Sequence, residues 1–181
     1  MASKRRERRE RQLSEIMQDA SGNLIYTGEL WRIADSKKAG SGTKQRVILI
    51  ACLTALTAIV AGSGCIDSMN AMGSFYVVLP YIGEVSALFG LAWSAVKVLV
   101  PSNGVRTYNL EYARPRIVGA SRILTVFALA GLLFSAVYLI RHGAGDKTTD
   151  GIAYLMLKIA AAALSEWFGY RFRATEWEKI A

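Results

Sequence analysis

The sequence has few of the residues that bind metals or form covalent links. Its 181 residues include one histidine and two cysteines. His142 has no cysteine or second histidine near it in the sequence, which makes it a poor metal ligand. Cys52 and Cys65 lie within one predicted helix, about 20 Å apart at helical rise, which is too far for a disulfide bond. We therefore expect no metal, no other cofactor and no disulfide bond within the chain.

Catalytic motifs are also missing. The chain has no phosphate-binding loop, no GxSxG sequence and no HExxH sequence. Residues 146–151 match the first half of a calcium-binding loop, but the twelfth position is Leu157 where such a loop needs a bidentate Glu. We therefore do not expect the protein to be an enzyme.

Charge is sparse in four long apolar stretches, which are residues 47–66, 75–100, 123–140 and 152–172. The first and third contain no charged residue. The second and fourth contain only Glu84, Lys97, Lys158, Glu166 and Arg171. A helix in a soluble bundle carries a polar face, whereas a membrane span needs about 20 mostly apolar residues. The sequence therefore predicts an all-α fold, an integral membrane four-helix bundle, with a small cytoplasmic segment before it.

The positive charges are distributed unevenly between the two sides of such a bundle. The segment 1–46 holds 11 Lys and Arg residues, and more follow in 101–122 and in the tail 173–181. The other two connections hold only Arg141 and Lys147. Because cytoplasmic flanks keep an excess of Lys and Arg, both termini are predicted to be cytoplasmic. Short loops and the absence of an Asn-x-Ser/Thr acceptor favour a bacterial cytoplasmic membrane.

A basic run opens the N-terminal segment. Residues 3–12 read SKRRERRERQ, in which the basic side chains expected to contact lipid or a partner include Arg5, Arg6, Arg8 and Arg9. Such a run beside a membrane is typical of contact with anionic lipid head groups, and we expect no nucleic acid partner. Opposite charges four positions apart predict a surface helix here, with Leu13, Ile16 and Met17 on its apolar edge.

The rest of the N-terminal segment is predicted to be a small module. A turn signal at 19–23 precedes a β-prone run at 24–27, and the Gly- and Ser-containing stretch 37–44 resembles a flexible tether. Trp31 would be the natural anchor of this module for a partner protein or a lipid surface. A partly disordered tail is the alternative interpretation.

Small residues recur at helical spacing along all four predicted spans. They are Ala51, Ala55, Ala58 and Gly62 on the first span, Gly83, Ala87, Gly90 and Ser94 on the second, Ala128, Gly131 and Ser135 on the third, and Ala162, Ser165 and Gly169 on the fourth. Stripes of this kind let helix backbones approach closely in a bilayer. They predict either tight packing within the chain or contact with another membrane subunit, including a second copy.

Two ionisable residues fall deep within the predicted spans. Counted from the outer ends of their helices, Glu84 lies roughly 14 Å deep and Lys158 roughly 9 Å deep. A charge at such depth costs about 2.5 to 3.5 kcal/mol on insertion scales and is usually paired. We therefore predict an intramembrane charge pair between Glu84 and Lys158.

Two hypotheses about function remain from the sequence. In the first, the protein is an accessory or scaffolding subunit of a larger membrane protein complex, which it contacts through small-residue stripes and the basic cytoplasmic segment. In the second, it is a small oligomeric transporter or channel that uses Glu84 and Lys158. Pro80, one turn before Glu84, favours the second hypothesis because interrupted helices line substrate sites in transporters.

Overall fold

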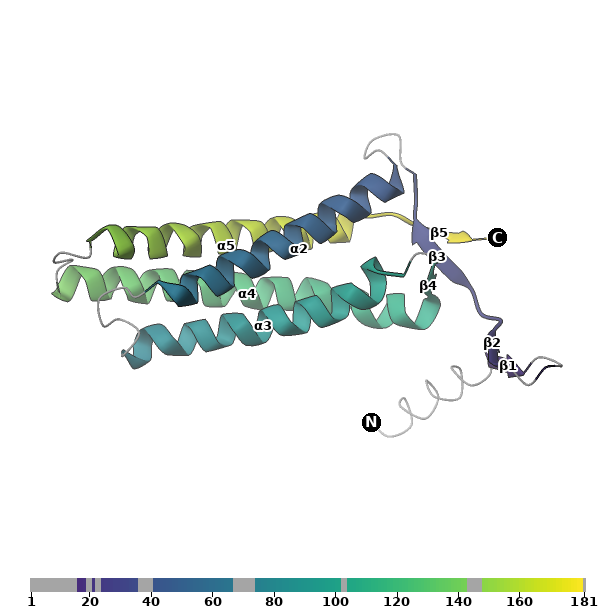
Figure 1. Cartoon of the computed structure of the whole chain (residues 1–181), viewed down its shortest axis with the longest axis horizontal. Coiled ribbons are helices and arrows are strands. Elements are labelled where there is room, and N and C mark those ends of the chain that lie inside the picture. Colours follow the sequence, from purple (N-terminus) through teal and green to yellow (C-terminus); the bar gives the residue numbers. More distant parts are fainter. Residues whose placement is uncertain are drawn as a thin grey trace.

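Four long helices and five short strands make up the part of the chain that the structure describes. The structure is a computed structural model, and it describes residues 16–18, 21, 24–35, 41–66, 74–101, 104–142 and 148–180. The helices are α2 (Gly42–Cys65), α3 (Phe75–Leu99), α4 (Thr107–His142) and α5 (Thr148–Ala174). They run alongside one another, and the strands gather at one end of the bundle (Figure 1).

All four helices are long and apolar enough to span a membrane. Each contains one of the four apolar stretches identified in the sequence, or most of it. This length and composition indicate a membrane protein with several spans.

Helix α4 is longer than the sequence predicted. Its 36 residues begin at Thr107, so that most of the predicted connection 101–122 is helical. The basic side chains in this stretch are exposed, while Leu110, Ala113 and Ile117 are buried. The charged part of α4 is therefore an amphipathic extension, in which apolar residues at helical spacing continue the core beyond the apolar stretch.

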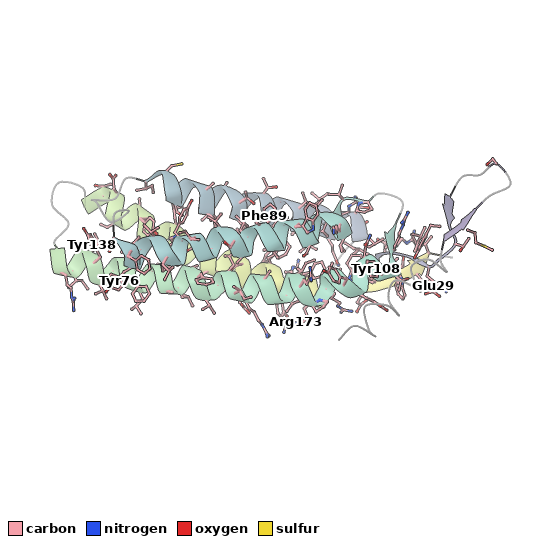
Figure 2. All side chains as sticks on the ribbon, turned by 90° about the horizontal axis from the view of Figure 1, so that it is seen from below. Glu29, Tyr76, Phe89, Tyr108, Tyr138 and Arg173 are labelled. Carbon is pink, nitrogen blue, oxygen red and sulfur yellow. The ribbon has the colours of Figure 1, made fainter. Side chains whose placement is uncertain are left out.

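Within the bundle, α4 packs along both α3 and α5, and α2 packs against α5 and α3. One core of buried apolar residues joins the four helices. It includes Leu56 of α2, Leu91 of α3, Leu124 of α4 and Phe168 of α5. In Figure 2, Tyr76 and Tyr138 lie at one end of this bundle, and Tyr108 and Glu29 lie toward the other.

A three-stranded antiparallel sheet closes the second end of the bundle. The strand order is β4 (Val105–Arg106), β3 (Leu30–Ile33) and β5 (Trp177–Ile180). Ion pairs of 2.5 Å between Arg32 Nε and Glu178 Oε1, and between Lys179 Nζ and Glu29 Oε1, join its exposed side chains. The fold is therefore not purely helical. In addition, β3 of the N-terminal segment is tied directly to the tail and to the connection before α4.

Trp31 has an internal role in this sheet. Its indole Nε1 donates a hydrogen bond to Thr107 Oγ1 at 3.0 Å, and the half-buried ring packs against the core. The ring thus joins β3 to α4, and the role of Trp31 as an anchor for a partner stays a prediction.

The beginning of the chain is only partly described. Strands β1 (Ile16–Gln18) and β2 (Leu24–Tyr26) form an antiparallel pair in which Met17 faces Ile25. The predicted strand at 24–27 is confirmed, but Ile16 and Met17 belong to a strand and not to a surface helix. The turn signal at 19–23 explains the difference, because it lets these residues fold back on the next β-prone run. Arg5, Arg6, Arg8 and Arg9 lie outside the described residues.

Candidate functional site

The predicted pair of Glu84 and Lys158 is formed in the structure. Lys158 Nζ lies 2.6 Å from Glu84 Oε2, and both side chains are 0% exposed. The pair joins α3 to α5 across the interior of the bundle. Because each charge neutralises the other, the pair is tolerated at a depth where a single charge is expensive.

Each member of the pair lies on the buried face of its helix. On α3, Pro80, Glu84 and Leu88 follow one another at four-residue spacing, and all three are buried. On α5, Tyr154, Lys158 and Ala162 do the same. Residues four apart share one helix face, so the apolar neighbours that direct each face inward also carry the charge into the core.

The Lys158 ammonium has partners besides Glu84. Its Nζ lies 3.3 Å from Ser63 Oγ of α2, and the Ser63 hydroxyl in turn donates to Val60 O at 2.8 Å. The rings of Tyr81 and Tyr154 lie 5.0 and 4.8 Å from Nζ, measured to the ring centroids. A carboxylate, a hydroxyl and two aromatic faces therefore surround the ammonium.

Gly131 brings α4 into the same site. A Cβ atom at this position would lie 3.1 Å from Glu84 Oε1, and close to Pro80 and the Lys158 stem as well. The missing side chain therefore leaves the space that the Glu84 carboxylate occupies. All four helices meet at this point.

Three polar atoms of the site retain hydrogen-bonding capacity. Glu84 Oε1 is buried and has no hydrogen-bond partner among the described residues, while the buried hydroxyl groups of Ser135 and Tyr154 interact with each other. A carboxylate oxygen accepts hydrogen bonds and hydroxyl groups donate them, so this set of atoms is chemically suited to a buried water or to proton transfer.

The sequence predicted the charged pair but not most of the residues that surround it. Ser63, Tyr81 and Tyr154 were not predicted as site residues, and Gly131 and Ser135 were seen only as part of a packing stripe. Tyr154 could have been predicted from the sequence, since it lies one turn before Lys158 on the same helix face. Ser63 and Tyr81 could not, because their proximity to Lys158 depends on how α2 and α3 pack.

The predicted stripe on α5 packs within the bundle. Ala162, Ser165 and Gly169 are all buried against α4 or other helices. Ser165 Oγ lies 2.7 Å from Thr125 Oγ1, and a Cβ on Gly169 would collide with the Ser121 side chain. This stripe therefore mediates close approach of α4 and α5.

Only part of the predicted small-residue stripe on α3 packs against other helices of this chain. Ser94 is buried, and Gly83 and Ala87 are half-buried. A Cβ on Gly83 would lie 2.5 Å from the Phe127 ring of α4, so glycine is needed for that contact. Gly90, in contrast, is exposed and nothing lies near the position of its missing Cβ. Gly90 is therefore not a packing residue of this bundle.

The stripe on α2 faces outward. Ala51, Ala55 and Ala58 are exposed, and a Cβ on Gly62 would meet nothing within 4 Å. The opposite face of α2 enters the core through Leu49, Cys52, Leu56, Val60 and Ser63. From residue 51 to the end of α2, no large hydrophobic side chain is exposed, whereas α3, α4 and α5 expose many. The outward surface of α2 is thus unlike the rest of the bundle.

These features fit a helical membrane protein of several spans, and a buried ion pair lies at its centre. No cluster of three or more His, Cys, Asp or Glu side chains suited to a metal ion occurs in the described residues. Comparison with known proteins found no matching family model, no similar curated protein and no similar solved structure. Its function is therefore argued from its own residues.

Proposed function

We propose that the protein is an accessory or scaffolding subunit of a larger membrane protein complex. The observation that supports this function is the outward face of α2. We define the α2 face as the exposed small residues Ala51, Thr54, Ala55, Thr57 and Ala58. Its partner is a transmembrane helix of another subunit or of a second copy of this chain.

The composition of the α2 face is suited to a helix partner. Lipid offers little hydrophobic gain to an apolar helix, so helices associate in bilayers mainly where small residues allow close packing. The Thr54 and Thr57 hydroxyls donate to Ile50 O at 3.0 Å and to Leu53 O at 2.9 Å, within their own helix. Neither hydroxyl therefore needs a partner from outside. The α2 face therefore offers a partner helix small side chains only, and its hydroxyl groups are already hydrogen-bonded within α2.

The buried ion pair supports this function by fixing the position of α2. Lys158 of α5 contacts both Glu84 of α3 and Ser63 of α2, so the three helices are linked at one point. A rigid bundle presents the α2 face in one orientation, which reduces the entropy lost when a partner helix binds.

We also propose that the end of the bundle with the three-stranded sheet is cytoplasmic, in a bacterial cytoplasmic membrane. Strands β3 and β5 pair with each other, so the strand before α2 and the strand after α5 lie at the same end of the bundle. Arg46, Arg122 and Arg173 lie in the segments at this end, which agrees with the preference of positive charge for the cytoplasm. The basic segment before β1 would then reach anionic lipid head groups.

A direct test compares two variants in which an exposed alanine is enlarged. The full chain carries a tag and is purified from native membranes in mild detergent, and proteins that co-migrate are identified. Ala58→Leu on the α2 face is expected to lose the partner, whereas Ala163→Leu, which is exposed on the bulky face of α5, should retain it. A wild-type chain that migrates as a lone monomer would contradict the proposal, and so would a partner retained equally by both variants.

Proton transport is a second candidate function. Glu84 Oε1 favours it, because this buried carboxylate oxygen has no hydrogen-bond partner among the described residues, and the interacting hydroxyl groups of Tyr154 and Ser135 lie beside the same ionisable pair. The test is proton flux into proteoliposomes under an imposed potential. Wild-type flux that disappears in the Glu84→Gln, Lys158→Met double variant would support transport. Flux that is absent in the wild type or unchanged in the variant would eliminate it.

A further inference from the structure

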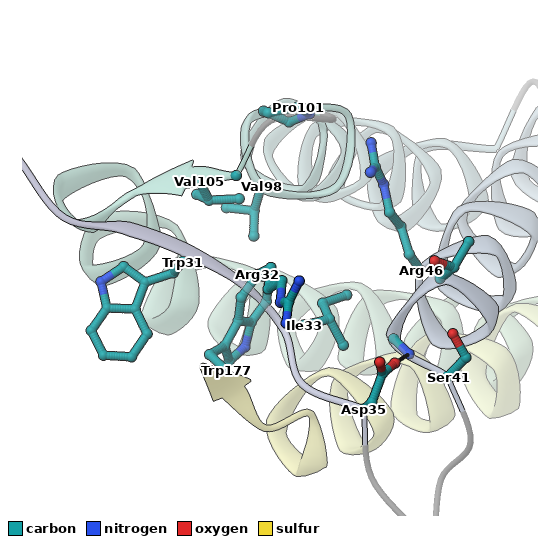
Figure 3. Close-up of a pocket in the computed structure, with 13 residues that line it drawn as sticks. Trp31, Arg32, Ile33, Asp35, Ser41, Arg46, Val98, Pro101, Val105 and Trp177 are labelled. Atoms are coloured by element: carbon teal, nitrogen blue, oxygen red, sulfur yellow. Dashed lines mark hydrogen bonds between the residues drawn. The ribbon is translucent and has the colours of Figure 1, made fainter. Parts of the chain in front are cut away.

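A second polar site lies far from the ion pair, where the sheet meets the ends of two helices. A cavity of about 190 Å³ opens between β3, the start of α2 and the end of α3 (Figure 3). Its walls include Arg46, Thr43, Val98, Pro101 and Trp177. Because α2 begins here and α3 ends here, the cavity lies at the level where membrane-spanning helices leave the hydrocarbon core.

Arg46 supplies positive charge to this cavity. Its guanidinium donates from Nε to Leu99 O at 2.5 Å and from Nη2 to Val100 O, which fixes the side chain at the end of α3. A guanidinium has five N–H donors, so the edge formed by Nη1 and Nη2 retains donors. That edge has the geometry that binds two oxygens of a phosphate. Arg32 lines the cavity as well; its Nε already pairs with Glu178 Oε1 at 2.5 Å, so it offers a phosphate only its Nη donors.

Trp177 also lines the cavity, but its Nε1 is inaccessible to solvent, so this N–H does not face the cavity. The one acidic residue in the lining, Asp35, already accepts a hydrogen bond from the Gly42 backbone N–H at 2.6 Å, which directs its carboxylate to the start of α2.

We propose that this cavity binds the phosphate group of an anionic membrane lipid. Arg46 would bind the phosphate through the Nη1–Nη2 edge of its guanidinium, and the Nη donors of Arg32 would add a second contact. The level of the cavity and its apolar wall of Val98 and Pro101 favour a lipid over a free phosphate, because acyl chains could continue along the bundle. The inference rests on the membrane insertion proposed above, but not on a partner at the α2 face.

The test measures retention of added ligands by native mass spectrometry of the full chain in detergent. Phosphatidylglycerol is compared with diacylglycerol of the same acyl chains, which lacks the phosphate, and with inorganic phosphate, which lacks the chains. Phosphatidylglycerol is expected to bind at least about tenfold more tightly than diacylglycerol, because hydrogen bonds to a charged group are strong. Inorganic phosphate at the same concentration should not displace it. Equal binding of both lipids, or displacement by inorganic phosphate, would overturn the proposal.

Two matched variants assign the binding to this cavity. Thr43→Asp places a negative charge in the cavity wall, and an acidic residue in the first turn of α2 is favourable for the helix, so the bundle should remain folded. We expect it to weaken phosphatidylglycerol binding at least about tenfold relative to Thr43→Asn, which has no charge. Unchanged binding in Thr43→Asp would place the lipid elsewhere, contrary to the proposal. If the wild-type chain bound neither lipid and could also be extracted from the membrane fraction without detergent, the membrane assignment itself would be wrong.

Discussion

The Lys158 ammonium lies 2.6 Å from the Glu84 carboxylate, and neither side chain is exposed. Removing one partner leaves the other charge buried without compensation, which costs about 3 to 5 kcal/mol in protein interiors. We therefore expect Glu84→Gln and Lys158→Met each to lower the free energy of unfolding by about 3 kcal/mol. The double variant should lose much less than the sum of the two single losses, as measured by unfolding in detergent.

The exposed pair of Lys179 and Glu29 serves as a control for that measurement. Both side chains are about half exposed, at 54% and 50%. Because solvent screens such pairs, their removal should cost less than about 1 kcal/mol. Strictly additive losses at Glu84 and Lys158 would contradict an energetic coupling between them.

A second prediction concerns the space that Gly131 leaves for the pair. A Cβ atom there would lie 3.1 Å from the buried Glu84 Oε1, so Gly131→Ala must shift the carboxylate of the ion pair; we expect this to outweigh the gain in helix propensity and to destabilise the bundle by about 1 kcal/mol. Gly119 lies in the same helix, but a Cβ at that position meets nothing within 4 Å. Gly119→Ala should therefore be neutral or should stabilise α4 by up to about 1 kcal/mol through helix propensity. Equal melting temperatures of the two variants would contradict the close packing at Gly131.

A third prediction tests the pairing of the N-terminal segment with the tail. Arg32 and Glu178 face each other across β3 and β5 and are both accessible. In a chain that carries Cys65→Ser, the Arg32→Cys, Glu178→Cys variant should form a disulfide bond under mild oxidation, because directly opposed strand residues have close Cβ atoms. Altered migration on a non-reducing gel would reveal it. The combination of Arg32→Cys with Arg173→Cys, which lies outside the strand pairing, should form none, and equal cross-linking in both would contradict the sheet.

The helices and the ion pair could be predicted because their signals are local. Long apolar stretches identify the four helices, and counting residues along two of them places Glu84 and Lys158 at similar depths. The three-stranded sheet could not be predicted in this way. Strand β4 has two residues and β3 and β5 have four each, and their pairing brings together residues near 30, 105 and 180. Such short strands have no useful periodicity, and their partners are set by the packing of the helices.

The buried face of α2 could not be predicted for a different reason. This helix is apolar on all sides, so hydrophobic periodicity does not distinguish its two faces. Ala51, Ala55 and Ala58 have helical spacing, but so do Cys52, Leu56 and Val60, which the structure buries. Small residues predict close packing without specifying whether the neighbouring helix belongs to the same chain.

The most direct test of the proposed function is site-specific cross-linking from the α2 face in intact membranes. A photoreactive amino acid is placed at position 58, and the same residue is placed at position 163 on the exposed, bulky face of α5 as the control. We expect irradiation to join position 58 to one protein of defined mass, either a partner subunit or a second copy, and position 163 to lipid only. Lipid adducts alone at position 58, with no protein product, would contradict a helix-binding role for the α2 face.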